Sequence, residues 1–168
     1  MKTDPHAEHR WLKRLVGTWR MTMAECAAEM PGGDGGQAGP ADNKWIETVR
    51  ELGDLFVVSE GRGTMPDDGA RAETLMVLGY DPRKGRYVGS WSGSMMDVFW
   101  VYEGTLDASG DVLTLDTTGP DFNAPDTLLP YQDIYTFESP TRRTLTSRMK
   151  GADGEWVQVM SATYERID

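Results

Sequence analysis

The sequence has one cysteine, two histidines and no long hydrophobic run, and each shortage excludes a class of protein. A single cysteine, Cys26, cannot form an internal disulfide, which is typical of proteins in a reducing compartment. No run of about 18 apolar residues occurs, so no membrane-spanning helix is expected. The opening "MKTDPHAEHR" lacks the apolar core of a secretory signal. Together these features predict a cytoplasmic protein.

Positive charge is scarce as well, with 17 Lys and Arg against 27 Asp and Glu and a net charge of −10. Such a surface repels phosphate backbones and anionic lipid headgroups. We therefore expect neither nucleic acid nor a membrane surface as a partner. The 168 residues are enough for one domain and leave little room for two, so residues 1–168 are interpreted as one domain.

The residues that most often carry catalysis or bind metals are also missing or isolated. His6 and His9 are three residues apart, but no third metal ligand is evident beside them. No histidine follows His9, so haem would need an unusual axial ligand. Cys26 lacks the basic neighbours that make a thiol reactive, and no serine-nucleophile motif occurs. The sequence therefore predicts no catalytic residue, no metal and no cofactor.

What the sequence does contain is a short helical pattern followed by strand patterns. Asp4 and Pro5 are typical of a helix start, and the apolar residues that follow recur at helical spacing. We predict a helix over residues 5–15, ended by Gly17. The predicted strands are Thr18–Glu29, Lys44–Leu52, Leu55–Gly63, Ala72–Tyr80, Tyr87–Gly93, Met95–Thr105, Val112–Thr118, Tyr131–Glu138, Thr141–Met149 and Glu155–Ile167.

Tight-turn sequences such as "YDPRKGRY" and "LDASGDV" separate these strands. The pattern predicts an all-β fold, an antiparallel up-and-down barrel of about ten strands with the short N-terminal helix at its floor. Two connections are longer, Pro31–Asn43 and Gly119–Pro130. Both join an odd strand to the next even one, so a meander places them at the same rim, the mouth, and the helix at the opposite end.

The stretch "LVGTWRM" places Gly17 two residues before Trp19, where the helix gives way to the first strand. Glycine permits a sharp passage between the two elements. This G-x-W after a short helix resembles the opening of the calycins, the group of lipocalins and fatty-acid-binding proteins. The resemblance implies that Trp19 packs at the barrel floor under an arginine from the end of the chain. Arg166 is the matching residue, because the last strand returns antiparallel to the first.

Longer segments are similar to one bacterial family. The stretches "EHRWLKRLVGTW", "YQDIYTF", "RTLTSRM" and "DGEWVQVMSATYER" resemble the domain of unknown function fifteen seventy-nine, and the resemblance covers nearly the whole chain. It implies a calycin-like barrel and brings no known activity, catalytic residue or cofactor.

Large apolar residues occupy both faces of the strands around "RYVGSWSGSMMDVFWVYEG", so periodicity leaves open which face points inward. A barrel of ten strands is generally too wide for its own side chains to fill, and methionine suits adaptable binding surfaces. We therefore expect an interior ligand site with a few polar groups. Its candidate residues are Trp91, Asp97, Trp100, Tyr102, Tyr135, Arg148 and Trp156.

Three functional hypotheses follow. The first is a lipocalin-like barrel that binds a small hydrophobic or amphipathic ligand in its interior. The second is a filled barrel that acts as a homodimeric interaction protein through the apolar face near residues 87–105. The third is an isomerase or cyclase, which a buried carboxylate beside a tyrosine would support.

Overall fold

The computed structural model describes residues 3–24, 45–65 and 68–168. Cys26 and the predicted loop Pro31–Asn43 lie outside the described residues, as does the end of the predicted strand Thr18–Glu29. All statements below refer to the described parts of the chain.

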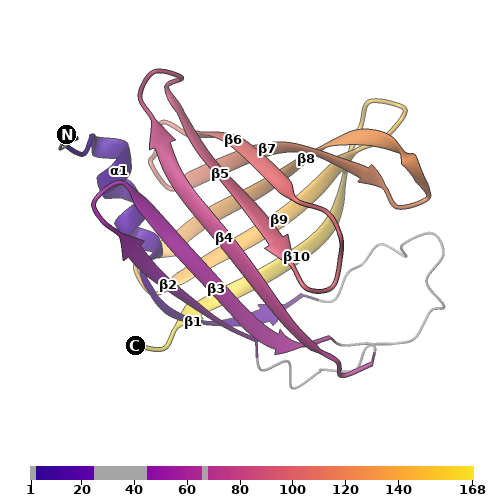
Figure 1. Cartoon of the computed structure of the whole chain (residues 1–168), viewed down its shortest axis with the longest axis horizontal. Coiled ribbons are helices and arrows are strands. Elements are labelled where there is room, and N and C mark those ends of the chain that lie inside the picture. The colour runs from indigo at the N-terminus through magenta and orange to yellow at the C-terminus, as the bar shows by residue number, and fades with distance from the viewer. Residues whose placement is uncertain (1–2, 25–44, 66–67) are drawn as a thin grey trace.

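The strands form one closed antiparallel barrel in which each strand pairs with its neighbours in sequence and β1 pairs with β10 (Figure 1). The predicted fold class is therefore confirmed. The strands are β1 (Gly17–Met23), β2 (Trp45–Leu52), β3 (Phe56–Thr64), β4 (Arg71–Asp81), β5 (Arg86–Gly93), β6 (Trp100–Leu106), β7 (Val112–Asp121), β8 (Ala124–Ser139), β9 (Arg142–Lys150) and β10 (Trp156–Arg166).

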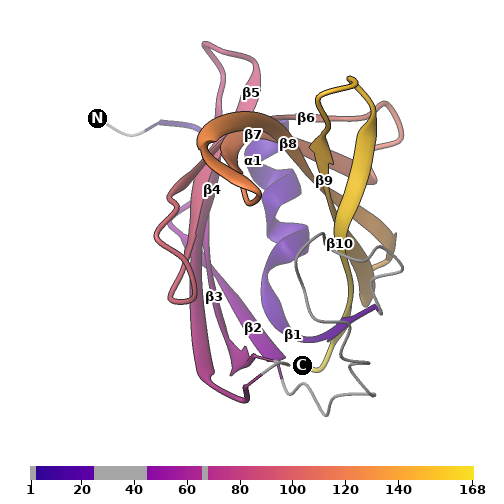
Figure 2. The ribbon, with the colours of Figure 1, turned by 90° about the vertical axis from the view of Figure 1, so that its right-hand side faces the viewer.

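The N-terminal helical segment closes one end of the barrel. It consists of α1 (Ala7–Trp11) and a 3-10 turn, η1 (Leu12–Leu15), and Figure 2 shows α1 crossing the barrel when the molecule is viewed along its length. Leu12 and Leu15 are each only 1% exposed, so the segment contributes its apolar face to the core. This burial of apolar surface, about 25 cal/mol per Å², is the main force that holds so short a helix in place.

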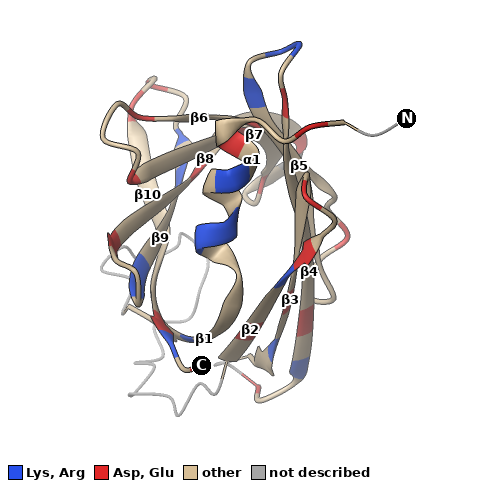
Figure 3. Cartoon of the chain, turned by 90° about the vertical axis from the view of Figure 1, so that its left-hand side faces the viewer, with Lys and Arg blue, Asp and Glu red and all other residues tan. Residues whose placement is uncertain are grey.

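The start of the helix differs from expectation, and its basic residues contact the barrel. The helix begins at Ala7 with His6 as its N-cap, rather than at Pro5, because the His6 N–H donates to Nδ1 of His9 (2.9 Å). Figure 3 shows basic residues on the helical segment, which faces the viewer. Lys13 pairs with Glu51 (3.0 Å) and Arg14 with Asp111 (2.9 Å), so these charges attach the helical segment to the barrel.

The predicted strand Met95–Thr105 is wrong in its first half. β6 begins at Trp100, and the preceding residues form a turned connection in which the Met96 N–H donates to the Gly93 carbonyl (3.3 Å). The predicted loop Gly119–Pro130 is also wrong, because β7 and β8 continue as a paired hairpin as far as Asp121 and Ala124. Proline has no N–H to donate to a neighbouring strand. Pro120 is tolerated because the pairing of β7 with β6 stops before it.

Exposure of the inward-facing residues divides the barrel into two halves. Around the helix they are completely buried, for example Trp19 (0%) and Leu113 (0%). Nearer the opposite end, the mouth, inward-facing residues such as Trp91, Ser147 and Met149 are only half-buried. The floor is therefore a packed core, and the mouthward half keeps part of its inner wall accessible.

Candidate functional site

Trp19 is the centre of the barrel floor. Its indole N–H donates to the Leu15 carbonyl (2.8 Å), and the Arg166 guanidinium lies 4.3 Å from its ring centroid. Arg166 also donates to the Arg14 carbonyl (3.1 Å) and to the Val16 carbonyl (2.5 Å), which ties the end of the chain to the helical segment. Gly17 has φ +136°, and a Cβ there would clash with the Arg166 guanidinium. These contacts explain the glycine two residues before the tryptophan.

Just above Trp19 lies a buried group that we call the paired cluster. It consists of the Glu47–Arg143 ion pair and Ser59. Arg143 is 0% exposed and donates through Nη2 to Glu47, which also accepts from the Ser59 hydroxyl. The Arg143 guanidinium lies 4.6 Å from the Trp19 ring and 4.3 Å from the Tyr164 ring. Opposite charges cancel here, so the paired cluster carries no net charge.

Farther toward the mouth lies a second polar group, the open cluster, formed by Tyr102, Asp133 and Ser147. The Tyr102 hydroxyl donates to one oxygen of Asp133 (2.5 Å), and the Ser147 hydroxyl donates to the other. Asp133 is half-buried and has no ion-pair partner in the described part of the chain. The open cluster therefore carries a carboxyl group with no compensating cation.

Burial raises the pKa of both titratable groups of the open cluster, the Asp133 carboxyl and the Tyr102 hydroxyl. Burial raises the pKa of Asp133, and the hydrogen bonds from Ser147 and Tyr102 only partly oppose that shift. Burial also raises the pKa of Tyr102 far above its usual range, and the nearby Asp133 charge adds to the effect. Tyr102 is therefore a permanent hydrogen-bond donor at ordinary pH, and Asp133 is the group that titrates.

An aromatic wall continues from the open cluster toward the mouth. Trp91 on β5 lies directly opposite Trp100 on β6, and the Trp100 and Tyr131 rings meet edge to face with centroids 5.0 Å apart. A Cβ at Gly119 would lie 2.2 Å from the Trp100 ring, so glycine is needed for the indole to pack against β7. Tyr131 is two residues from Asp133 on the same strand, and alternation gives both the same inward face.

The barrel wall opens between β6 and β7 beside this aromatic wall. The two strands pair only from Glu103–Asp116 to Leu106–Leu113, and their mouthward halves separate. Glu103 and Asp116 are like charges directly opposite each other, an arrangement that disfavours pairing, and the ion pair of Glu103 with Lys84 offsets part of this repulsion.

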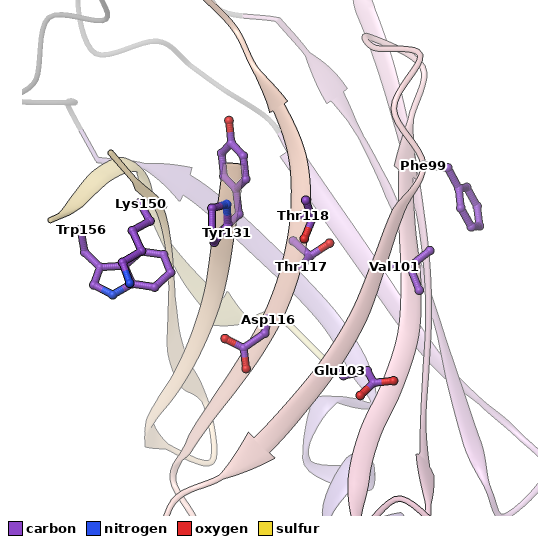
Figure 4. Close-up of a pocket in the computed structure, with 10 residues that line it drawn as sticks. Phe99, Val101, Glu103, Asp116, Thr117, Thr118, Tyr131, Lys150 and Trp156 are labelled. Atoms are coloured by element: carbon purple, nitrogen blue, oxygen red, sulfur yellow. The ribbon is translucent and has the colours of Figure 1, made fainter. Parts of the chain in front are cut away.

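An open groove of about 600 Å³ lies along this separation. Most of its lining side chains face outward, and it also reaches Thr117 and Tyr131, which face inward. Figure 4 shows Phe99, Val101 and Glu103 on one side of the groove and Trp156 and Lys150 on the other.

The structure brings together only part of the predicted ligand-site set. Trp91, Trp100, Tyr102 and Tyr135 face the interior, and Tyr135 lies between the two clusters with its hydroxyl 3.7 Å from the Met76 sulfur. This resolves which face of β6 points inward: Trp100 and Tyr102 are buried, whereas Val101 is exposed.

Three predicted residues lie elsewhere. Asp97 is exposed in the connection between β5 and β6. Arg148 and Trp156 are on the outer face, where the guanidinium lies 4.8 Å from the indole ring and donates to Gln132 (2.7 Å). Strand alternation is the reason: Ser147 faces inward on β9, so its neighbour Arg148 faces outward.

Sequence reasoning missed the polar residues that the interior does contain. In "YQDIYTF" the alternation puts Asp133 on the same face as Tyr131 and Tyr135, and this signal was available. Arg143 likewise alternates with Leu145, but nothing in the sequence identifies Glu47 as its partner, because strands β2 and β9 are far apart along the chain. Such a contact is defined only by closure of the barrel.

The chemistry of the open cluster follows from its hydrogen bonds. A carboxylate beside a tyrosine is the arrangement that an isomerase or cyclase would need, but here both hydroxyls donate to Asp133 itself. The cluster therefore accepts hydrogen bonds and does not offer the free donor that would stabilise an enolate oxygen. That is the chemistry of a site for a donor or a cation.

Other site types find less support among the described residues. No group of three or more potential metal ligands occurs there, and both ring nitrogens of His9 contact backbone groups, the His6 N–H and the Tyr80 carbonyl. In the same residues, no helix has the length and apolar character required to cross a bilayer.

Two solved structures share the fold. Rv2717c from M. tuberculosis is 15% identical with a TM-score of 0.60, and the match covers 98% of this chain and 100% of that one. The S-type phycobiliprotein lyase CPES from Guillardia theta is 17% identical with a TM-score of 0.55, over 98% of this chain and 99% of that one. At these identities the likeness concerns the fold alone.

Comparison by sequence identifies a family. No curated protein matches the chain significantly. The family model described as "protein of unknown function (DUF1579)" matches residues 4–166, nearly the whole length. The chain therefore belongs to the DUF1579 family, whose function is unknown.

Proposed function

We propose that this protein binds a small hydrophobic or amphipathic molecule inside the mouthward half of the barrel, with its polar end at the open cluster. The observation that carries the proposal is Asp133, an inward-facing, half-buried carboxyl group without a cationic partner among the described residues. A partly buried carboxyl group without a cationic partner lowers the stability of the folded state, and such groups are typical of binding and catalytic sites.

The surroundings of Asp133 support binding of an apolar body. Trp91, Trp100 and Tyr131 form an aromatic wall, and the nearby Met149 and Met160 are half-buried. Ligand sites are typically lined by apolar and aromatic side chains with a few polar groups that fix orientation. The open cluster supplies such polar groups at the inner end of the wall.

Native mass spectrometry of freshly purified protein, compared with the denatured mass, tests the proposal. We expect an additional mass that is lost on denaturation, and titration with candidate ligands should change the fluorescence of Trp91 and Trp100. A bare native mass, together with no fluorescence change for any apolar compound tried, would contradict the proposal.

A homodimer is the second candidate, and it is compatible with ligand binding. Phe99 (65% exposed) and Val101 (61% exposed) lie together beside the groove between β6 and β7. Exposed apolar patches of this kind are common at protein interfaces. Light scattering at high concentration should show a dimer that Val101→Lys disrupts; a strict monomer would exclude this role.

We further propose a cytoplasmic location, which the single cysteine supports. Cell fractionation with an antibody against the protein tests this assignment.

A further inference from the structure

The charge of the barrel interior predicts the class of ligand, an inference that depends on the proposed function above. Glu47 and Arg143 neutralise each other near the floor. Asp133 is inward-facing and has no such partner in the described parts of the chain. Once Asp133 is ionised, the accessible part of the described interior therefore carries one uncompensated negative charge.

The geometry of the open cluster leaves room for another hydrogen bond. An ionised carboxylate has about four acceptor positions. The Tyr102 and Ser147 hydroxyls each occupy one, on different oxygens. Both donors hold the carboxylate in one orientation, and each oxygen keeps acceptor capacity for a group that arrives from the barrel interior.

The aromatic wall favours the same kind of group. The negative faces of tryptophan and tyrosine rings attract cations. Tyr131 lies two residues from Asp133 on the same inner face of β8, its ring contacts that of Trp100, and Trp91 lies opposite Trp100. A ligand carboxylate would face both these rings and the Asp133 charge. The net charge of −10 also raises the concentration of cations near the protein.

We propose that the barrel selects cationic amphiphiles, in which a primary ammonium group pairs with Asp133 and an apolar chain or ring system lies along Trp91, Trp100 and Tyr131. The ammonium has three donors, and two of them can fill the acceptor positions that Tyr102 and Ser147 leave free on Asp133. The same charge disfavours anionic amphiphiles with the same apolar part.

A head-group series tests this selection in the unmodified protein. Decylammonium, 1-decanol and decanoate share their apolar chain and differ in head-group charge. Their affinities are measured by calorimetry below their micellar concentrations. The measurement is made at about pH 8, well above the usual pKa of a carboxyl group. We expect decylammonium to bind about tenfold or more tightly than decanol, and decanoate to bind most weakly.

Two variants locate the preference. Asp133→Asn keeps the shape of the side chain and removes the charge, so decylammonium should bind no more tightly than decanol. Glu138→Gln is the matched control, because Glu138 is an exposed carboxylate on the same strand that pairs with Arg142 on the outer surface. It should leave the order of affinities unchanged.

The outcomes separate the inference from the proposed function. Decanoate binding as tightly as decylammonium, or an ammonium preference that survives Asp133→Asn, would overturn the inference while ligand binding stands. If none of the three compounds binds and the native mass is bare, the proposed function fails with it. The head-group order in unmodified protein stays decisive even if Asp133→Asn does not fold.

Discussion

The paired cluster and the open cluster are built from similar parts and have opposite characters. Each contains a carboxylate that accepts from a serine hydroxyl on the inner wall. In the paired cluster a fully buried arginine neutralises the charge, and helix and aromatic rings exclude water. In the open cluster a tyrosine replaces the arginine and the carboxyl stays half-buried. The difference fits a structural role for the paired cluster and the ligand-binding role proposed above for the open cluster.

Removal of Arg143 from the paired cluster should have the largest effect on stability. Arg143→Ala leaves Glu47 buried without its cation, and we expect the free energy of unfolding to fall by about 3–5 kcal/mol. Chemical denaturation measures this loss. Arg142→Ala is the control, because Arg142 is an exposed neighbour whose ion pairs contribute about 1 kcal/mol or less. Equal losses in the two variants would show that the paired cluster is not structural.

The tryptophan below the paired cluster should have an effect of similar size. Trp19 is 0% exposed at the floor, so Trp19→Ala leaves a cavity and should lower the free energy of unfolding by about 3–5 kcal/mol. Trp156→Ala, on the outer face, should cost much less. A loss below about 1 kcal/mol for Trp19→Ala would refute the interpretation of "VGTW" as the barrel floor.

The open cluster should instead reveal itself through pH. Because burial raises the pKa of Asp133 above its unfolded value, the stability that its protonated form contributes is present at low pH and is lost as pH rises through the raised pKa. Asparagine does not titrate. The free energy of unfolding of Asp133→Asn, relative to the unmodified protein, should therefore increase from about pH 3 to about pH 8.

Urea unfolding at a series of pH values measures this difference. Glu138→Gln provides the baseline for loss of one exposed carboxylate from the same strand. A stability difference for Asp133→Asn that is independent of pH, or that falls as pH rises, would mean that Asp133 is not destabilised by burial.

The smallest effect concerns the wall beside the open cluster. Asp116→Lys replaces the repulsive Glu103–Asp116 pair with an attractive one, so we expect stabilisation of about 0.2–1 kcal/mol by thermal or chemical unfolding. Amide hydrogen exchange at Val101 and Thr117 should slow if the strands close farther toward the mouth. Unchanged exchange would show that repulsion does not end the pairing.

Local signals in the sequence predicted the barrel and its floor far better than the ligand site. Turn residues and strand alternation depend on near neighbours, so the strand order was accessible to sequence reasoning. The same alternation would have distinguished Ser147 from Arg148 if the inward face had been known. The Glu47–Arg143 and Tyr102–Asp133 contacts join strands separated by long stretches of chain, and only the closed register defines them. Polar partners in a barrel are therefore the last feature that a single sequence reveals.

The separation of β6 from β7 also bears on whether another chain could add a strand to the barrel. A closed barrel normally has no exposed strand edge to which another chain could add. Here the parted halves expose two short edges, and the residues around them work against intermolecular strand addition: Glu103 and Asp116 place negative charge at the junction, and Pro120 lacks the N–H that a new strand would need. These three residues therefore disfavour aggregation through strand addition at the opening in the barrel wall.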